Sequence, residues 1–521
     1  MKTLLIRPPA KFIKGAIQPS ISLPTGLLYL AAVLEEAGHA VSIYDAQLNK
    51  DMPVSPDVDG ARHMGDSWEA VRQRISDERP RLIGISCMFT AQMENALYLA
   101  ELIKRIDSSI ITIIGGSHAT ARPQDFFNKT RAIDMACIGE GEFTLREIVE
   151  RLKAGLDAST VPGTAVREGE TVRINVQRSR NTDLDSIPLP AYHLIDLEDY
   201  FRLYTRGYTD RPIPRTNGFE RSVSVITSRG CPYKCIFCSV HLHMGRAWRP
   251  HSISYVKRHL DLLVSQYGVR HIHFEDDNIS LNADRFRGIL ELLKTAQPKL
   301  TWDTPNGLRV DTLSREILML CRDSGCIYLI FGVESGNQTV LNTIVDKHLD
   351  LETVTRASSW ASDIDINVMA FYVIGFPGET PAQMRDTVHF ALRLQAEYGV
   401  TPNLFIATPI PGTRLEQECI ERGFIPESLS PQDLAKMTQG VIFMNTDSFT
   451  REDVTLILKS YYKGYRNNVI KQGLTLMLRK PHRILRFFWH IMAFWKVLPF
   501  PESVFRAVLL GRWIVRNPIR R

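Results

Sequence analysis

Short hydrophobic runs alternate with amphipathic stretches along the first 150 residues of the chain. The runs are rich in Val, Ile and Leu, and stretches such as TGLLYLAAVLEEAG (25–38) separate them. The hydrophobic runs are TLLIR (3–7), AVSIYD (40–45), RLIGIS (81–86), IITIIGG (110–116) and IDMACIG (133–139). Nearly continuous apolar strands separated by helices indicate a parallel sheet that helices cover on both faces. The pattern therefore predicts a doubly wound α/β domain over residues 1–160.

A second series of strands and helices follows a stretch that contains prolines. Residues 161–220, which include DSIPLPAY (185–192), are predicted to be a linker with extended backbone around its prolines. Six apolar runs with helical patterns between them come next: SVSVITS (222–228), HIHFED (271–276), LTWDTPN (300–306), IYLIFGVE (327–334), INVMAFYVIG (366–375) and NLFIATP (403–409). Such repeats are typical of a βα barrel, whose functional groups sit at the carboxyl ends of the strands. We predict a partial (β/α)6 barrel over residues 221–425 and an α-helical segment over 426–521.

The strand ends of the first domain point to a ligand site. In an open parallel sheet, ligands bind in the crevice beyond the carboxyl ends of the strands. These ends read SCMFT (86–90), GGSHAT (115–120) and GEGE (139–142), and their glycines let the backbone approach a flat ligand. No G-x-G-x-x-G follows the first strand, so a dinucleotide is not the favoured ligand.

Length and composition agree with a chain of several globular domains. Its 521 residues exceed the roughly 250–300 at which a single core stops growing. Hydrophobic residues make up 44% and charged residues 23%, which is typical of an ordered protein. Eight cysteines in so long a chain, without a signal-peptide start, argue against a secreted disulfide scaffold. We therefore expect a protein of the reducing cytoplasm.

Basic residues are concentrated at the C-terminal end. Residues 471–521 contain eleven Lys and Arg and one acid, Glu502, and many aromatic and aliphatic residues lie among them. The uncharged stretch 487–495 is shorter than the about 20 apolar residues that span a bilayer. Two interpretations stay open, an amphipathic helix in the membrane interface or a helix packed on the barrel. The segment is too apolar for a nucleic-acid arm, so we expect no nucleic-acid partner.

Three cysteines follow the first strand of the predicted barrel. Cys231, Cys235 and Cys238 lie in SRGCPYKCIFCS (228–239), whereas the other five cysteines are scattered. A structural zinc site normally takes four ligands, and an iron-sulfur cluster held entirely by protein usually takes four cysteines. Three cysteines can hold three irons of a [4Fe-4S] cluster and leave the fourth open for a small molecule. A Cys3His zinc site that uses His241 or His243 is the alternative.

The spacing C-x3-C-x-aromatic-C, with Phe237 before Cys238, resembles the radical S-adenosylmethionine (radical SAM) superfamily. The resemblance implies that the open iron holds the amino and carboxylate groups of S-adenosylmethionine (SAM) and that Phe237 packs near the adenine. It also implies that later strand ends contact SAM, in the segments FEDDN (274–278), GVESGN (332–337) and YVIGFPGET (372–380). The candidate residues there are Glu275, Asp276, Asp277, Glu334, Ser335 and Gly375. FEDDN differs from the Gly-Gly-Glu motif that is commoner in the superfamily at this strand end. Which of its three acidic residues faces SAM therefore stays open.

A doubly wound domain ahead of such a barrel resembles the cobalamin-binding class of this superfamily. The matching segments are residues 22–45, GGSHAT and IGEGE (138–142). Residues 1–150 contain no D-x-H-x-x-G, so no histidine is offered as the lower cobalt ligand, and the resemblance implies a corrin held base-off between the domains. The candidate corrin contacts are Ser86, Gly116, His118, Thr120 and Gly139. The alternative is a domain that binds no corrin and only supports the barrel.

The sequence after the sixth predicted strand of the barrel is similar to that of the cobalamin-dependent phosphonate C-methyltransferases. The similarity rests on residues 407–426 and 436–446 together with FEDDN. It implies that a methyl group moves from SAM, by way of methylcobalamin, to an unactivated carbon of a small-molecule or lipid-like substrate through a 5'-deoxyadenosyl radical. It also implies an external electron donor of the flavodoxin or ferredoxin type, and no side chain that acts as acid or base.

Two other functions stay open at this point. A radical SAM cyclase or rearrangement enzyme would use the same cofactors and the same residues. A corrin-binding sensor whose second domain is held by zinc would need no radical chemistry. If the basic C-terminal segment touches a membrane, a lipid-like substrate and a membrane-associated location follow.

Overall fold

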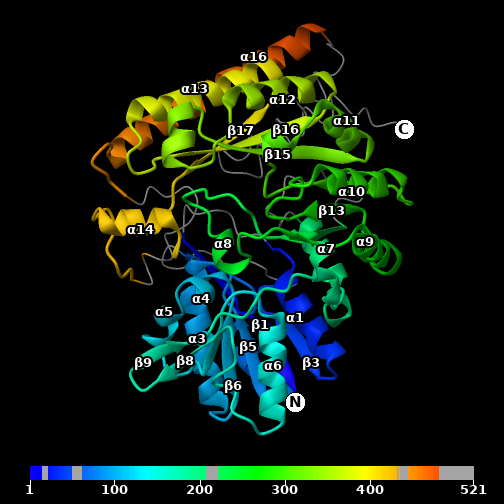
Figure 1. Ribbon diagram of the computed structural model, residues 1–521, viewed down its shortest axis with the longest axis vertical. Helices are drawn as coiled ribbons and strands as arrows, with labels where there is room; N and C mark the ends of the chain where they lie inside the picture. Colours follow the sequence, from blue (N-terminus) through cyan, green and yellow to red (C-terminus); the bar gives the residue numbers. More distant parts are fainter. Residues whose placement is uncertain (14–20, 50–60, 207–220, 431–432, 434–443, 480–521) are drawn as a thin grey trace.

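The computed structural model describes residues 1–13, 21–49, 61–206, 221–430, 433 and 444–479, apart from the side chains after residue 472. The first α/β unit lies below the barrel in Figure 1, and the C-terminal helix lies at the top. The prediction for residues 480–521, which include the basic tail, falls outside the described residues.

The first domain is built on a seven-stranded sheet, and the doubly wound prediction is confirmed. Its strand order is β3 (Val41–Asp45), β1 (Thr3–Arg7), β5 (Leu82–Ser86), β6 (Ile111–Gly115), β7 (Met135–Cys137), β8 (Thr164–Glu168) and β9 (Thr171–Ile174). The first five strands are parallel, and β8 and β9 are antiparallel. The order of the parallel strands reverses between β1 and β5, and this reversal is where such sheets bind their ligands.

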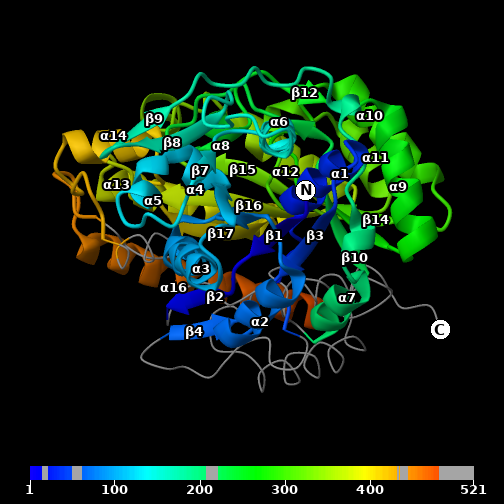
Figure 2. The same ribbon diagram turned by 90° about the horizontal axis from the view of Figure 1, so that it is seen from below.

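Helices cover both faces of the first sheet (Figure 1). They are α1 (Thr25–Glu36), α2 (Trp68–Glu78), α3 (Met93–Ile106), α4 (Ser117–Ala121), α5 (Pro123–Phe127) and α6 (Glu142–Lys153). A short antiparallel pair, β2 (Ala10–Ile13) with β4 (Ala61–Met64), lies beside the sheet (Figure 2). The apolar faces of α1 and α3 are buried against the sheet, which is what their amphipathic pattern predicts.

The stretch predicted as a linker contains structure that the sequence analysis did not predict. Strands β8 and β9 extend the first sheet, and α7 (Leu197–Thr205) packs against its edge. The Tyr200 hydroxyl of α7 donates a hydrogen bond to Asp45 Oδ2 (2.5 Å), and Arg7 pairs with the same carboxylate. The ends of β1 and β3 are therefore covered by α7.

The second domain is a partial (β/α)6 barrel, as predicted. Its strands follow chain order and are all parallel: β10 (Ser222–Val225), β13 (His271–Phe274), β14 (Thr301–Asp303), β15 (Cys326–Glu334), β16 (Asn367–Ile374) and β17 (Thr401–Ile406). The helices between them form an arc outside the strands (Figure 1): α9 (Ile253–Tyr267), α10 (Ala283–Thr295), α11 (Arg315–Asp323), α12 (Leu351–Asp363) and α13 (Pro381–Tyr398). The sheet ends at β10 and β17, so the barrel is open along one side.

Two helices follow the barrel within the described residues. These are α14 (Arg414–Glu421) and α16 (Arg451–Arg479), and α16 lies along α13 in Figure 1. Val454, Ile457, Tyr461 and Tyr465 form the buried stripe of α16, at a spacing that places them on one helical face. No described helix combines the length and apolar character needed to cross a membrane.

Trp302 is a test of the barrel core. Its indole is fully buried between Phe274 and Phe286, and its Nε1–H donates to Ser324 Oγ (3.1 Å). Trp302→Ala should lower the free energy of unfolding by about 3–5 kcal/mol, because it leaves a large cavity and removes the hydrogen bond to Ser324. Met319→Ala, on the exposed side of α11, should change it by less than about 1 kcal/mol. Denaturant unfolding of both variants measures this, and equal losses would contradict the assigned core.

Candidate functional site

The cysteine loop leaves the barrel between two short strands that close its base. These are β11 (Ser228–Arg229) and β12 (Arg249–Pro250), which pair antiparallel, and the loop between them holds all three cysteines and α8 (Val240–His243). Gly230 has φ +87°, and a Cβ there would lie 2.4 Å from the Ala247 carbonyl oxygen. Only glycine therefore fits this entry to the loop.

The three thiols are free and half-buried, and their spacing tests the zinc alternative. In a tetrahedral zinc site, sulfur ligands at about 2.3 Å from the metal lie roughly 3.8 Å from one another. Across the described part of the chain, one group of three or more potential ligands has all its donor atoms within 4.8 Å, and it contains no cysteine. The ring of His241 contacts the Cys238 carbonyl oxygen (3.0 Å) rather than a sulfur. The described part of the chain therefore shows no preformed compact Cys3His site, and the three cysteines as ligands of an iron-sulfur cluster stay a prediction.

The protonation of the thiols also depends on a bound metal. Burial raises the pKa of Cys231 and Cys235, and it raises the pKa of Cys238 to about 12. Lys347 and Arg309 oppose this rise at Cys235. Thiolates are the ligand form, and coordination to a cation is what removes the proton from a buried thiol.

Two buried cations flank the cysteine loop. Arg309 lies 3.6 Å from the ring centroid of Tyr233, and its Nη1 donates to the Lys347 carbonyl oxygen (3.1 Å). Lys347 Nζ donates to Glu334 Oε1 (2.8 Å). Glu334 has φ +73°, a conformation that costs energy in any residue with a side chain and that is enriched at functional sites. The sequence analysis predicted Glu334 as a SAM contact and did not identify either cation.

The three acids of FEDDN point in different directions. Asp276 is buried and accepts hydrogen bonds from the Thr227 amide and hydroxyl and from the Ser228 hydroxyl, so it holds the strand end that leads into the cysteine loop. Asp277 accepts from the Gly230 amide (2.8 Å), and burial raises its pKa to about 6. Glu275 accepts from the Ser224 hydroxyl (2.6 Å). Asp277 is the acid tied directly to the cysteine loop.

Phe237 and the YVIGFPGET segment lie together. The Phe237 ring packs beside Phe376 with centroids 6.0 Å apart, and Gly375 precedes Phe376 at the end of β16. The amides of Gly375 and Phe376 donate to Glu379 Oε2 (2.7 and 3.1 Å), while Glu379 Oε1 is buried and has no hydrogen-bond partner among the described residues. Burial raises the pKa of Glu379 to about 8. This carboxyl shapes the turn, and the sequence analysis did not single it out.

Ser335 follows β15 and contacts α13, the helix that comes after that segment. Its hydroxyl is buried and lies 3.0 Å from the Thr387 hydroxyl of α13. The same oxygen accepts from the Asn337 amide (3.1 Å). The side chain therefore ties the end of β15 to α13, and its predicted contact with SAM stays a prediction.

The first domain turns the ends of β5, β6 and β7 toward the barrel. Gly116 has φ +117°, and a Cβ there would lie 2.4 Å from the Cys87 carbonyl oxygen, so this turn requires glycine. Thr120 Oγ1 accepts from the Gly139 amide (3.0 Å), and a Cβ at Gly139 would meet open space. Ser86 ends β5, and the loop after it exposes 51% of Met88 and 71% of Phe89. Two exposed apolar side chains beside open glycine backbone fit a large flat ligand such as a corrin.

His118 is turned into the first domain. It is buried, with Nδ1 3.0 Å from Thr90 Oγ1 and Nε2 near Met93 and Asp125. Its ring also packs edge-on against Phe126. These contacts occupy both ring nitrogens of His118. Its predicted contact with the corrin periphery stays a prediction.

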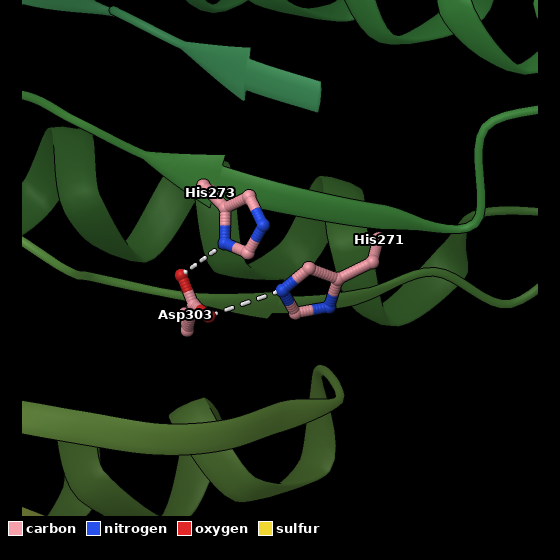
Figure 3. Close-up of side chains that lie close together, drawn as sticks. All are labelled: His271, His273 and Asp303. Carbon is pink, nitrogen blue, oxygen red and sulfur yellow. Dashed lines mark hydrogen bonds and ion pairs between the residues drawn. The ribbon is translucent and has the colours of Figure 1, made fainter. Parts of the chain in front are cut away.

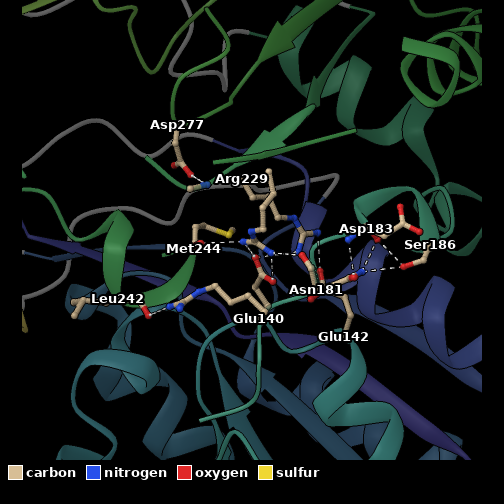
Figure 4. Close-up of polar contacts among 12 residues, drawn as sticks. Glu140, Glu142, Asn181, Asp183, Ser186, Arg229, Leu242, Met244 and Asp277 are labelled. Atoms are coloured by element: carbon tan, nitrogen blue, oxygen red, sulfur yellow. Dashed lines mark hydrogen bonds and ion pairs between the residues drawn. The ribbon is translucent and has the colours of Figure 1, made fainter. Parts of the chain in front are cut away.

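A buried ion-pair network joins the two domains at this site. Arg229, two residues before Cys231, pairs with Glu142 (2.8 Å) and Glu140 (3.7 Å) of the first domain. Arg249 of β12 forms a two-pronged pair with Glu140 (2.5 and 2.9 Å). The four side chains are at most 10% exposed, and Figure 4 shows both glutamates pointing toward Arg229. Burial alone would raise the pKa of Glu142, but Arg229 outweighs it and lowers the pKa.

A second ion pair crosses the same interface. Arg122 of the first domain pairs with Glu416 of α14 (2.7 Å), and Glu416 Oε2 accepts from the Gly412 amide (2.7 Å). The Glu416 side chain is 6% exposed. The barrel and the first domain's turns around Thr120 and Gly139 are thus held together by ion pairs at two places.

Comparisons with known proteins agree with this architecture. Residues 19–149 match the B12 binding domain, and residues 225–391 match the radical SAM superfamily. Cytidylyl-2-hydroxyethylphosphonate methyltransferase of Streptomyces wedmorensis is 31% identical over 85% of either chain. An uncharacterized methyltransferase of Pyrococcus horikoshii is 29% identical over 89% of this chain and 92% of its own. The solved structure of the cobalamin-dependent SAM radical enzyme OxsB with aqua-cobalamin covers 99% of this chain and 73% of its own, with TM-score 0.65 and 18% identity.

The interdomain network makes a stability prediction. Arg249→Met should lower the free energy of unfolding by about 3–5 kcal/mol, because it leaves Glu140 buried without its main partner. Adding Glu140→Gln should restore part of that loss. Arg131→Met, which breaks an exposed pair with Glu170, should cost no more than about 1 kcal/mol. Denaturant titration compares the variants, and a loss at Arg249 as small as that at Arg131 would refute the network's role.

Glu379 makes a prediction about pH. Its folded pKa, about 8, lies above the ordinary 4.5, so the folded state holds its proton more tightly and loses stability as pH rises from about 4.5 to about 8. Each unit of the raised pKa corresponds to about 1.4 kcal/mol. Glu379→Gln keeps an oxygen for the two amides and cannot ionise, so its stability should fall less over this range. Unfolding curves at several pH values test this, and parallel pH profiles would show that Glu379 is ionised throughout.

Proposed function

The chain belongs to the family of cobalamin-dependent radical SAM methyltransferases, and we propose that it methylates an unactivated carbon of a small organic molecule. The family's cofactors are cobalamin, a [4Fe-4S] cluster and SAM. A lipid-like molecule is one form that the substrate could take under this proposal. The proposed electron donor is a protein of the flavodoxin or ferredoxin type.

The observation that carries the proposal is the ion-pair network that connects the two segments proposed to bind the cofactors. The loop that bears the cysteines and the turn that bears Gly139 are linked by the buried pairs of Arg229 and Arg249 with Glu140 and Glu142. Methyl transfer between two cofactors needs both to face one substrate at short range, and a rigid link favours that arrangement. This link supports transfer over independent action of the two domains.

Each side chain has a defined part in the proposal. The three cysteines would hold the cluster, and Asp277, Glu334, Phe237 and Gly375 would orient SAM beside it. Ser86, Gly116, Thr120 and Gly139 would line the corrin. When bound, the cluster with SAM supplies a 5'-deoxyadenosyl radical, and cobalamin supplies the methyl group. The chain itself binds, orients and keeps water out, and no acid or base is required of it.

The outcome for the methyl group decides between the two enzyme classes. In a cyclase or rearrangement enzyme, the carbon label of the SAM methyl group would not enter the product. The 31% identity to a phosphonate methyltransferase favours transfer. Product analysis after turnover with methyl-labelled SAM and candidate substrates separates them, because label in a product carbon supports methylation and unlabelled product refutes it.

The cluster assignment has a direct test. Cys235→Ala should abolish both cluster assembly and the formation of 5'-deoxyadenosine from SAM, because three cysteines are the minimum for the proposed site. Cys326→Ala, at the start of β15, should keep both, since the Cys326 thiol donates to the Tyr328 carbonyl oxygen (3.4 Å) and lies outside the cysteine loop. Iron and sulfide content and chromatography of 5'-deoxyadenosine measure the two properties. Continued formation of 5'-deoxyadenosine by the Cys235 variant would refute the assignment.

A further inference from the structure

A second group of metal-ligating side chains lies inside the barrel, away from the cysteines. His271 and His273 stand on β13 and Asp303 on β14, where His273 and Asp303 are direct register partners (Figure 3). Trp302, between the β14 positions, packs outward on Phe286 of α10, so Asp303 faces the barrel interior. The group lies below Glu275, which follows two residues after His273. None of the roles proposed above uses it.

The nitrogen and oxygen donor atoms of His271, His273 and Asp303 lie close together. His273 Nδ1 lies 2.8 Å from Asp303 Oδ1, and His271 Nε2 lies 3.1 Å from Asp303 Oδ2. One donor atom from each residue can be chosen so that all three lie within 4.8 Å. The residues are 1%, 4% and 1% exposed, so water does not solvate the carboxylate. Two imidazoles and one carboxylate are a donor set that divalent first-row transition metals prefer.

The hydrogen bonds around His271 fix which of its nitrogens carries a proton. The Thr301 hydroxyl donates to the Arg270 carbonyl oxygen (3.2 Å), so it accepts from His271 Nδ1–H (2.9 Å). In a neutral imidazole this leaves the lone pair on Nε2, pointing at Asp303 Oδ2. Two acceptors 3.1 Å apart repel each other unless a positive charge lies between them. A histidine whose other nitrogen is held by a hydrogen-bond acceptor is also the usual form of a metal ligand.

We propose that His271, His273 and Asp303 bind one divalent transition-metal ion, of which Zn²⁺ is the test case. In a tetrahedral site, metal bonds of about 2.0–2.2 Å would put neighbouring donors roughly 3.4 Å apart, so the 2.8 and 3.1 Å contacts would open by a few tenths of an ångström to admit the ion. As a ligand through Nδ1, His273 gives up the proton at that nitrogen and carries one on Nε2 instead, so the imidazole stays neutral and no other covalent bond changes. A charge-assisted N–H···O bond in place of the metal would be about 2.7–2.9 Å, shorter than the His271 contact.

A further oxygen is available beside the site. Ser222 on β10 is the register partner of His271, on the side opposite Thr301. Its hydroxyl is buried and has no hydrogen-bond partner in the described part of the protein. A buried hydroxyl without a partner is costly, and a metal ion or its bound water would satisfy it. The Ser222 hydroxyl is therefore a second observation, independent of the histidines, that favours a bound ion or water at this group.

The test uses the full chain with Cys231, Cys235 and Cys238 replaced by Ala, because thiolates compete for zinc. After incubation with Zn²⁺ and removal of excess ion, mass spectrometry should find one zinc per chain. Adding Asp303→Asn or His273→Gln should lower this at least tenfold, and adding His389→Ala, an exposed histidine on α13, should leave it unchanged. In the reconstituted wild-type protein, one zinc should appear besides the cluster iron.

Two further readouts keep the test decisive if a variant folds poorly. Zn²⁺ should raise the melting temperature of the cysteine-free chain and not that of its His273→Gln form. Co²⁺ in place of Zn²⁺ should give visible ligand-field bands that the same variant loses. Absence of bound zinc from the cysteine-free chain, or binding that Asp303→Asn leaves intact, would overturn the proposal, and a proton shared between His271 and Asp303 would then account for the contact. None of these measurements depends on methyl transfer.

Discussion

Four buried charges between the domains are the constraint on which the site depends. Arg229, Arg249, Glu140 and Glu142 all lose their water, and such a loss is tolerated only when every charge finds its partner in good geometry. The partners come from opposite domains, so the domains cannot separate or slide without exposing unpaired ions. Arg229 is two residues from Cys231, and Glu140 is adjacent to Gly139. The relative position of the cysteine loop and the Gly139 turn is therefore fixed by the same interaction that holds the domains together.

The hydrophobic pattern was sufficient for most of the fold. Each apolar run predicted as a strand became a strand, because fully buried parallel strands leave a continuous signal that does not depend on distant partners. Strands β8 and β9 were missed, since TAVRE and TVRI are short, partly polar and add to an edge of the sheet. The prolines nearby indicated a linker, and the pairing of β8 with β7 is a long-range effect that local sequence does not contain.

The part of the candidate site that lies in one sequence motif could be predicted. The part that forms where distant segments of the chain meet could not. The cysteines and Phe237 stand in a single loop, so their spacing was enough. Lys347 and Arg309 approach that loop from positions 70 to 120 residues away, and in sequence they look like ordinary surface cations. The strained backbone at Glu334 is likewise invisible in the sequence, because GVES has no glycine at the position that turns left-handed.

The exposed pair Met88 and Phe89 has a consequence for how the protein matures. Apolar side chains at a strand end are useful only once a ligand covers them, and before that they are a patch that can associate with other chains. Replacing them with polar residues would make the newly made chain more soluble and, under the proposed function, would remove apolar surface that the corrin could cover. Under that proposal, solubility and cofactor affinity act in opposite directions on these two positions.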